Sequence, residues 1–164
     1  MRGQLFTIKD KMPVQKFSVS KLISSPAHIV YSIIADYNDA HPKILPNPPF
    51  VSLEVVKGGV GAGTEMIVGM EMFRKVQKFG AVVTEPNPGR TLVETTDTGY
   101  RTTFSVEPEN DGKKSLVTFT TELVGNPGIL KRLEFWLTSK LLRPVYKKEL
   151  ENLSDTSAKR IDLS

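Results

Sequence analysis

The chain of 164 residues contains no cysteine and only two histidines, His28 and His41. The absence of cysteine excludes disulfides, thiolate metal ligands, thiol nucleophiles and iron–sulfur clusters. A histidine-rich metal centre is not expected either, and we predict no bound metal. Without disulfides the fold depends on an apolar core, and this length, with 39% hydrophobic residues, suits one domain with such a core.

Long hydrophobic runs and dense blocks of charge are also absent. No apolar run approaches the roughly 20 residues that cross a bilayer, and residues 1–13 lack the apolar segment and cleavage site of a secretory signal. A cytoplasmic location is the resulting expectation. Lysine and arginine number 22 against 18 aspartates and glutamates, without a block of like charges. Nucleic-acid binding usually needs a denser basic patch with interleaved aromatic side chains, so we expect no nucleic-acid partner.

The N-terminal third of the chain predicts one strand and two short helices. Residues 1–14 are expected to be flexible, and alternating side chains over 15–23 indicate a strand. Ser25-Pro26 predicts a helix start, with the serine hydroxyl as N-cap and proline in the first turn. Apolar residues at helical spacing carry this helix to about Asp36. The prolines between 42 and 49 then allow only a short helical turn and a loop.

The middle of the chain predicts six strands joined by short turns. The strand segments are 50–57, 64–73, 75–84, 91–96, 100–107 and 115–123. Thr98-Gly99 and residues 110–112 are hairpin signals, so strands that are neighbours in sequence should pair antiparallel. The glycine run 58–63 does not match a dinucleotide-binding motif, because Thr64 stands where that motif needs glycine, and it lacks the lysine of a P-loop. It predicts a flexible hairpin turn.

Residues 129–158 predict a single long helix. Its apolar stripe consists of Leu130, Leu133, Leu137, Leu141, Val145, Leu150 and Leu153. Pro144 lies inside this pattern and should kink the helix. Residues 159–164 are polar and are expected to form a flexible tail. No linker divides residues 15–158, which therefore form one domain.

This order of elements predicts an α+β fold. A curved, seven-stranded antiparallel sheet should wrap around the long C-terminal helix, with two short helices after the first strand. A helix of about 30 residues reaches about 45 Å, but a single helix cannot fill the concave side of such a sheet. We therefore expect a cavity between sheet and helix, with the glycine run at its mouth, and such cavities usually hold small molecules.

Short motifs occur along the chain in an order that resembles the START-like helix-grip superfamily, which includes polyketide cyclases and dehydrases, lipid-transfer domains and birch-pollen-allergen-like proteins. The motifs are Ser25-Pro26-Ala27, Val30-Tyr31, Asp36-Tyr37-Asn38, residues 41–46, 60–64 and 85–90, Thr102 with Phe104, Val106 and Pro108, and residues 142–146 and 150–153. The resemblance covers roughly residues 15–154. It is closest to the branch of polyketide cyclase/dehydrase and lipid transport. It implies a ligand cavity without metal or cofactor, and often no catalysis, but it does not specify the function.

Nine residues are candidates for contact with a ligand. They are Tyr37, Met66, Met70, Tyr100, Thr102, Phe104, Leu133, Trp136 and Leu137. Methionine side chains adapt to an irregular apolar ligand, and tyrosine hydroxyls can orient one. Plain core packing is the alternative for the methionines and for Trp136.

His41 is the one candidate for an acid–base role, because imidazole titrates near neutral pH. Catalysis would require a carboxylate or tyrosine within hydrogen-bond reach. Asp36, Asp39 and Glu94 are the carboxylates considered, although the sequence does not position them. The simpler alternative is a surface histidine that precedes Pro42.

The leading hypothesis is a protein that binds one hydrophobic small molecule, such as a lipid, isoprenoid, quinone or polyketide. One alternative is an enzyme of the polyketide cyclase, aromatase or dehydratase type, which two ionisable groups converging in the cavity with shifted pKa values would favour. Another is a membrane-associated quinone or lipid chaperone. The basic residues of the long helix would then make a transient contact with anionic lipid, although a solvated face is the simpler interpretation.

Overall fold

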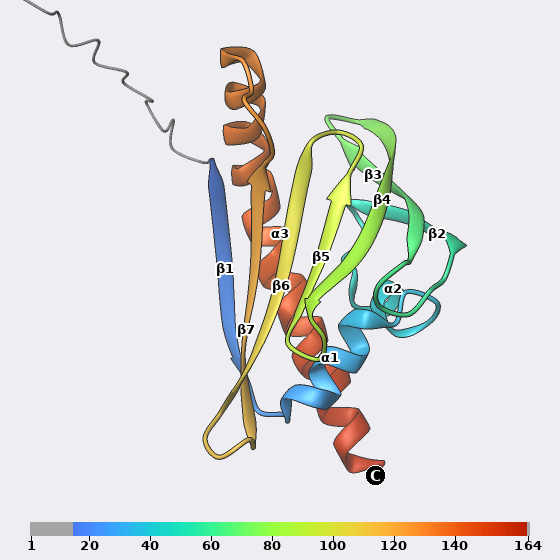
Figure 1. Ribbon diagram of the computed structural model, residues 1–164, viewed down its shortest axis with the longest axis vertical. Helices are drawn as coiled ribbons and strands as arrows, with labels where there is room; N and C mark the ends of the chain where they lie inside the picture. The colour runs from blue at the N-terminus through green and yellow to red at the C-terminus, as the bar shows by residue number, and fades with distance from the viewer. Residues whose placement is uncertain (1–14, 164) are drawn as a thin grey trace, which may run out of the picture.

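The computed structural model describes residues 15–163, and the segment 1–14 that we expected to be flexible lies outside them. The elements follow one another in the predicted order (Figure 1). They are β1 (Lys16–Ile23), α1 (Ala27–Ala35), α2 (Ala40–Ile44), β2 (Phe50–Lys57), β3 (Glu65–Met72), β4 (Lys75–Asn87), β5 (Thr91–Thr96), β6 (Tyr100–Glu109), β7 (Lys114–Leu123) and α3 (Ile129–Asp162). The predicted strands and helices are confirmed, and their ends shift by a few residues.

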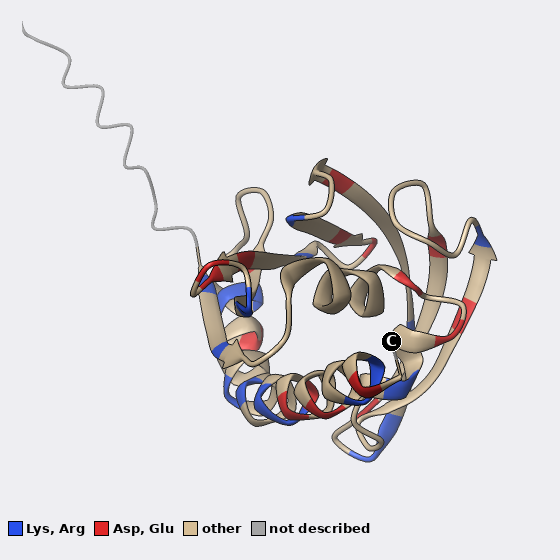
Figure 2. Cartoon of the chain, turned by 90° about the horizontal axis from the view of Figure 1, so that it is seen from below, with Lys and Arg blue, Asp and Glu red and all other residues tan. Residues whose placement is uncertain are grey.

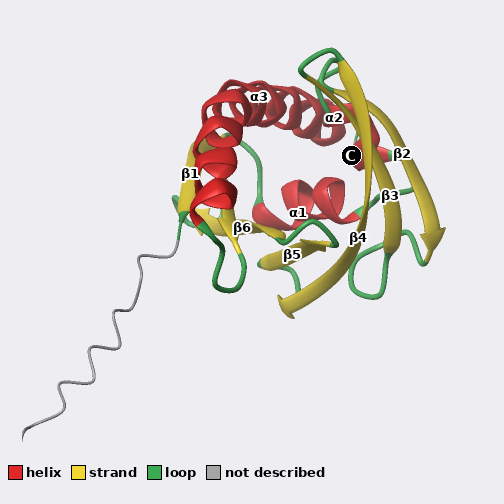
Figure 3. Cartoon of the chain, turned by 90° about the horizontal axis from the view of Figure 1, so that it is seen from above, coloured by secondary structure: helices red, strands yellow, loops and turns green. Residues whose placement is uncertain are grey.

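The seven strands form one antiparallel sheet in the order β1-β7-β6-β5-β4-β3-β2. Strands β2 to β7 each pair with their sequence neighbours, whereas β1 closes the far edge by pairing with β7, where Phe17 lies opposite Thr121. Side chains alternate between the two faces of each strand, so Val117, Phe119 and Thr121 of β7 are all buried on one face. The sheet curves around α1 and α3 (Figure 3), and this curvature creates its concave side.

The start of α1 differs from the prediction. Pro26 occupies the N-cap position, and no side chain caps the helix. The Pro26 carbonyl accepts hydrogen bonds from the backbone N–H groups of Ile29 and Val30. The Ser25 hydroxyl lies 2.9 Å from the hydroxyl of Ser157 on α3, and both residues are buried. The expected serine N-cap is therefore wrong, because this serine links the start of α1 to the end of α3.

The glycine run 58–63 connects β2 to β3 and holds the end of α1. The backbone N–H of Tyr37 donates to the Gly59 carbonyl at 2.8 Å. Gly59 has a φ of +125°, and a Cβ at this position would collide with the Asn38 side chain, so glycine is required here. None of the glycine-run residues lines the cavity described below. The expected position at a cavity mouth is therefore wrong.

Helix α3 spans the height of the molecule (Figure 1). It continues to Asp162, so the segment predicted as a flexible tail is helical up to that residue. Arg160 Nη1 donates to Ser32 Oγ of α1 at 3.0 Å, which holds this last turn in place. Pro144 lies within α3, and the helix axis changes direction along its length (Figure 3), as proline in a helix interior causes.

The main core lies where the C-terminal half of α3 meets α1 and the sheet. Leu150 and Leu153 are 1% and 0% exposed and belong to one apolar cluster with Ile33 and Ile34 of α1. The N-terminal half of α3 is different, because most of its large apolar side chains face solvent. Within residues 15–163, no helix combines the length and hydrophobicity that a bilayer crossing requires.

The two halves of α3 predict different responses to truncation of a leucine. Leu153→Ala should lower the free energy of unfolding by about 2–5 kcal/mol, because it leaves a cavity in a packed core. Leu133→Ala removes the same atoms from a side chain that is 55% exposed, and should change stability by less than about 0.5 kcal/mol. Urea unfolding of both variants measures the difference. Equal losses would contradict the observed orientation of α3.

Candidate functional site

A cavity of about 250 Å³ lies between the concave face of the sheet and α3. Its lining residues are His41, Leu45, Phe50, Leu53, Met66, Val68, Met70, Met72, Phe73, Gln77, Phe79, Glu94, Thr96, Thr98, Tyr100, Thr102, Phe104, Thr121, Lys131, Glu134, Thr138, Leu142, Tyr146 and Glu149. The wall is therefore largely apolar, with a few polar groups. This is the composition typical of small-molecule sites, and it agrees with the expected cavity between sheet and helix.

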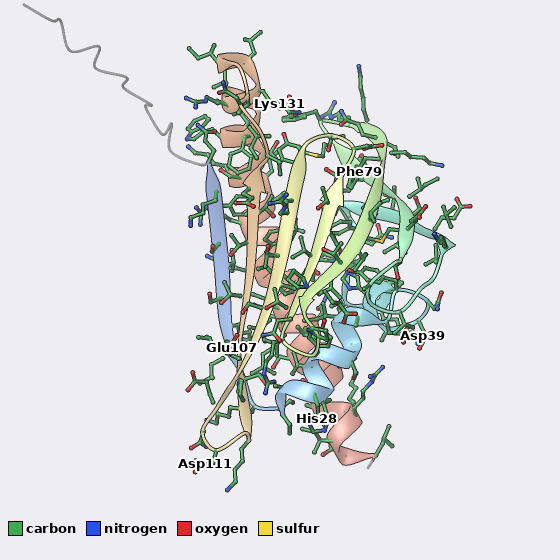
Figure 4. All side chains as sticks on the ribbon, viewed as in Figure 1. His28, Asp39, Phe79, Glu107, Asp111 and Lys131 are labelled. Atoms are coloured by element: carbon green, nitrogen blue, oxygen red, sulfur yellow. The ribbon has the colours of Figure 1, made fainter. Side chains whose placement is uncertain are left out.

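The mouth of the cavity opens between the start of α3 and the β3–β4 hairpin. Phe73 lines the cavity although it is 70% exposed, which places it at the rim. Lys131 and Phe79 lie at this end of the molecule, opposite His28 (Figure 4). At the rim the Tyr100 hydroxyl donates to Glu134 Oε1 at 2.8 Å, and Lys131 Nζ lies 3.0 Å from the same oxygen. These three side chains join β6 to α3 beside the entrance.

One wall of the cavity comes from the alternating side chains of β3. Met66, Val68 and Met70 are buried and Met72 is partly buried, and all four line the cavity. Alternation along the strand placed them on one face in the sequence, and the structure turns that face inward. The two methionine candidates, Met66 and Met70, therefore serve the core and the cavity at once.

A second wall comes from β6, where Tyr100, Thr102 and Phe104 alternate onto the same face and line the cavity. Thr102 Oγ1 lies 2.9 Å from Thr121 Oγ1, which lies 2.6 Å from the hydroxyl of Tyr146 on α3. Burial raises the pKa of Tyr146 above the usual tyrosine value, so its hydroxyl stays neutral. The hydroxyl groups of this wall bond to one another across the sheet and to the helix.

His41 is buried, with 3% exposure, and the surface position considered in the sequence analysis is wrong. Its Nδ1 lies 2.6 Å from the Ile34 carbonyl, which can only accept, so Nδ1 carries the hydrogen. The ring stacks on Tyr37, with centroids 4.6 Å apart. Burial lowers the pKa of His41 to about 4, which leaves the ring neutral at pH 7 with Nε2 as an acceptor.

Two glutamates accompany His41 at the inner end of the cavity. Glu94 Oε1 lies 4.0 Å from His41 Nε2, and Glu149 on α3 is only 2% exposed. Burial raises the pKa of Glu94 to about 7, an effect that the hydrogen bond from Tyr37 partly offsets. Burial, and then repulsion from Glu94, raises the pKa of Glu149 well above the usual value. Near neutral pH the pair therefore holds at least one proton.

Tyr37 is a ligand candidate that the structure places behind the cavity wall. It is 1% exposed and is not among the lining residues. Its hydroxyl donates to Glu94 Oε1 at 2.7 Å. Any effect of Tyr37 on a ligand would therefore pass through Glu94, which it holds in position.

The three candidates on the long helix lie outside the cavity. Leu133, Trp136 and Leu137 are 55%, 50% and 43% exposed, and none lines the cavity. The inward face of α3 carries Phe135, Thr138, Leu142, Tyr146 and Glu149 instead. The apolar stripe of the sequence therefore marked the outer face over this half of the helix.

The outer face of α3 also carries charged residues of both signs (Figure 2). One of its lysines, Lys140, lies with its Nζ 3.9 Å from the centre of the Trp136 ring. The basic side chains thus stand beside exposed apolar ones. The transient contact with an anionic membrane surface stays a prediction for this face, and liposome co-sedimentation that weakens with salt would test it.

Glu149 is the functional candidate that the sequence analysis missed. The sequence did contain a sign of it, because Glu149 is a charged residue on the same helix face as Tyr146, Leu150 and Leu153. Glu94 had a signal too, because alternation places it on the same face of β5 as the buried Leu92. In the described part of the chain, no group of three or more His, Asp or Glu side chains is arranged to hold a metal ion.

The buried carboxyl groups predict a characteristic pH dependence of stability. Glu94 has its pKa raised from 4.5 to about 7 in the folded protein, so the unfolded chain releases the proton first and stability falls as pH rises through this window. The difference in unfolding free energy between Glu94→Gln and wild type should therefore increase in favour of the variant by about 1–3 kcal/mol from pH 5 to pH 8. Chemical unfolding at both pH values measures this gain.

The matched control for this prediction is Glu54→Gln, which removes the same charge from an exposed position on β2. His41, with its lowered pKa, gives the opposite slope as pH falls below 6.5, but it is present in both proteins and cancels in the comparison. A stability difference for Glu94→Gln that is the same at pH 5 and pH 8 would contradict the shifted pKa.

Several solved structures share this architecture. The structure is similar to the KanY protein, with 26% identity, a TM-score of 0.75, and coverage of 90% of this chain and 99% of that one. It is also similar to the protein TTHA0849 from Thermus thermophilus, with 20% identity, a TM-score of 0.70, and coverage of 89% and 99%. The Zhui aromatase/cyclase from a Streptomyces species shares 10% identity, with a TM-score of 0.71 and coverage of 90% and 96%.

No curated protein sequence matches the chain. The family model described as polyketide cyclase/dehydrase and lipid transport matches residues 14–158, nearly the whole chain. The predicted START-like resemblance and helix-grip fold are therefore confirmed. The chain belongs to the polyketide cyclase/dehydrase and lipid transport family.

Proposed function

We propose that the protein binds one hydrophobic small molecule in the cavity between the sheet and α3. The observation that carries this proposal is the apolar wall of Met66, Met70, Phe79 and Phe104 around a space of about 250 Å³. Transfer of apolar surface from water to such a wall is favourable by about 25 cal/mol per Å². The family to which the chain belongs, named for polyketide chemistry and lipid transport, supports the same proposal.

The open rim of the cavity bears on the length of the ligand. Phe73 lines the cavity although it is 70% exposed, so the cavity opens to solvent beside it. A long isoprenoid or lipid tail would extend through this mouth, whereas a short apolar ligand would lie wholly inside.

Filling part of the cavity should weaken binding while the fold persists. Met70→Trp places a larger ring in the wall and should weaken octanol binding by at least about tenfold, equivalent to about 1.4 kcal/mol. Isothermal titration calorimetry measures the affinity, and circular dichroism confirms folding. Leu137→Trp makes a similar change on the outer face of α3 and should leave the affinity unchanged.

A wild-type protein that retains nothing from a lipid extract by native mass spectrometry, and that binds neither octanol nor octylamine, would contradict the proposal. Equal weakening by Met70→Trp and Leu137→Trp would contradict the assignment of the binding site to this cavity.

A second candidate function is acid–base catalysis in the same cavity. The observation in its favour is the convergence of Glu94, Glu149 and His41 at the inner end, with shifted pKa values for all three. A Glu94 carboxylate with a pKa of about 7 suits a general base at neutral pH. It would take a proton from the carbon next to a ligand carbonyl, while the protonated Glu149 donates a hydrogen bond to the carbonyl oxygen.

Deuterium exchange tests this second candidate directly. Wild-type protein in D₂O should incorporate deuterium next to the carbonyl of 2-octanone, and Glu94→Gln should lower that rate by about a hundredfold, the low end for loss of a general base. Mass spectrometry of the recovered ketone measures the rate, and the exposed-site variant Glu54→Gln should exchange like wild type. Wild-type exchange no faster than in buffer would exclude this activity for simple ketones.

A further inference from the structure

The carboxyl group of Glu149 belongs to a buried residue of the cavity lining and has no hydrogen-bond partner among the described residues. The residue is 2% exposed and lines the cavity. Among the described residues, no hydrogen bond or ion pair involves its side chain, whereas Glu94 accepts from Tyr37 at 2.7 Å. A ligand that supplies a hydrogen-bond donor at this point gives the carboxyl group the partner that the described residues do not provide.

The inner end of the cavity also lacks a positive charge. The basic side chains that line the cavity are His41 and Lys131. His41 is neutral near pH 7 because burial lowers its pKa to about 4. Lys131 lies at the mouth, 3.0 Å from Glu134. The carboxyl groups of Glu94 and Glu149 are therefore balanced by protons alone, with no cation of the described chain beside them.

None of the other groups near the two glutamates supplies a positive charge. His41 presents Nε2 as an acceptor, because Nδ1 donates to the Ile34 carbonyl. The Tyr37 hydroxyl donates to Glu94, and the Tyr146 hydroxyl lies 2.6 Å from Thr121 Oγ1. The described chain thus offers no cation to Glu94 and Glu149, and a protonated amine, which donates hydrogen bonds and carries the missing charge, would pair with these carboxyl groups once they ionise.

We propose that the preferred ligand is an amphipathic amine, with its protonated nitrogen between Glu94 and Glu149 and its apolar chain along Met66 and Met70 toward the mouth. This inference rests on the proposed binding function and deepens it. An alcohol of the same length makes the same apolar contacts but has no charge to interact with the two glutamates. A fatty acid is disfavoured, because its carboxylate adds a third acidic group to the inner end.

The proposal predicts how the affinity for an amine changes with pH. Ammonium binding requires ionised glutamates, so affinity should rise between pH 5.5 and pH 8, the range that spans the pKa of Glu94 near 7. An alkylammonium stays protonated throughout this range, as lysine does. A ligand that accepts hydrogen bonds from protonated glutamates would show the opposite trend. Amine binding should also release protons, because it drives ionisation of Glu94 and Glu149.

Three probes of equal chain length test the inference: octylamine, octanol and octanoate. Calorimetry at pH 8 should show octylamine binding at least about tenfold more tightly than octanol, and octanoate most weakly, where tenfold corresponds to about 1.4 kcal/mol. The octylamine affinity should fall at pH 5.5. In two buffers of different ionisation enthalpy, the heats of octylamine binding should differ in the direction of proton release.

Variants assign the preference to the two glutamates. The double variant Glu94→Gln, Glu149→Gln preserves side-chain shape and should lose the preference for octylamine over octanol. Circular dichroism shows whether the double variant is folded. Glu54→Gln, which removes an exposed carboxylate outside the cavity, should keep the preference.

The outcomes separate this inference from the proposed function. If octanol and octylamine bind equally, or octanoate binds most tightly, the amine preference is wrong while cavity binding stands. If the double variant keeps the preference, the nitrogen lies elsewhere. If none of the three probes binds wild-type protein, the proposed function itself fails.

Discussion

The structure depends on one packing constraint: a single helix lies across a curved sheet of seven strands and cannot fill it. The C-terminal half of α3 packs Leu150 and Leu153 into the core with α1. The N-terminal half turns much of its apolar surface to solvent and faces the sheet with Phe135, Thr138 and Leu142. The space left between strands β2 to β7 and the part of α3 from Lys131 to Glu149 is the cavity. One helix therefore contributes both to the packed core and to the wall of the cavity.

The chemistry of the cavity follows from what is buried beside that space. Burial raises the pKa values of Glu94 and Glu149 and lowers that of His41. A carboxyl group held in such surroundings weakens the fold as pH rises. Sites of this kind combine a cost in stability with a capacity to bind or react.

The sequence predicted the fold well because the signals for it are local. Alternation marked the strands and put Met66 and Met70 on one face, and proline and glycine marked the turns. Which face of each strand points inward came from the structure, where Met66, Met70, Thr102 and Phe104 line the cavity. The sheet order followed from the short connections. The family motifs pointed to the same architecture, which the match over residues 14–158 confirms.

The predictions that were wrong concern the rotation of α3 about its axis and the surroundings of single polar side chains. Leu133, Trp136 and Leu137 form the more apolar stripe of the helix, yet they lie outside, because the inward face must combine core residues with Tyr146 and Glu149. Periodicity identifies a stripe but does not say which stripe meets the sheet when the helix borders a cavity. Tertiary partners likewise set the positions of two other side chains. Ser25 bonds to Ser157, and His41 bonds to the Ile34 carbonyl.

The central claim is that an apolar guest occupies the space beside β3. Methionine methyl groups report on it directly, since Met66 and Met70 line the cavity. In protein labelled with ¹³C at the methionine methyls, octanol or octylamine should shift both resonances and give nuclear Overhauser contacts to the ligand chain. Saturating concentrations of both probes that leave these two resonances unchanged would contradict the account.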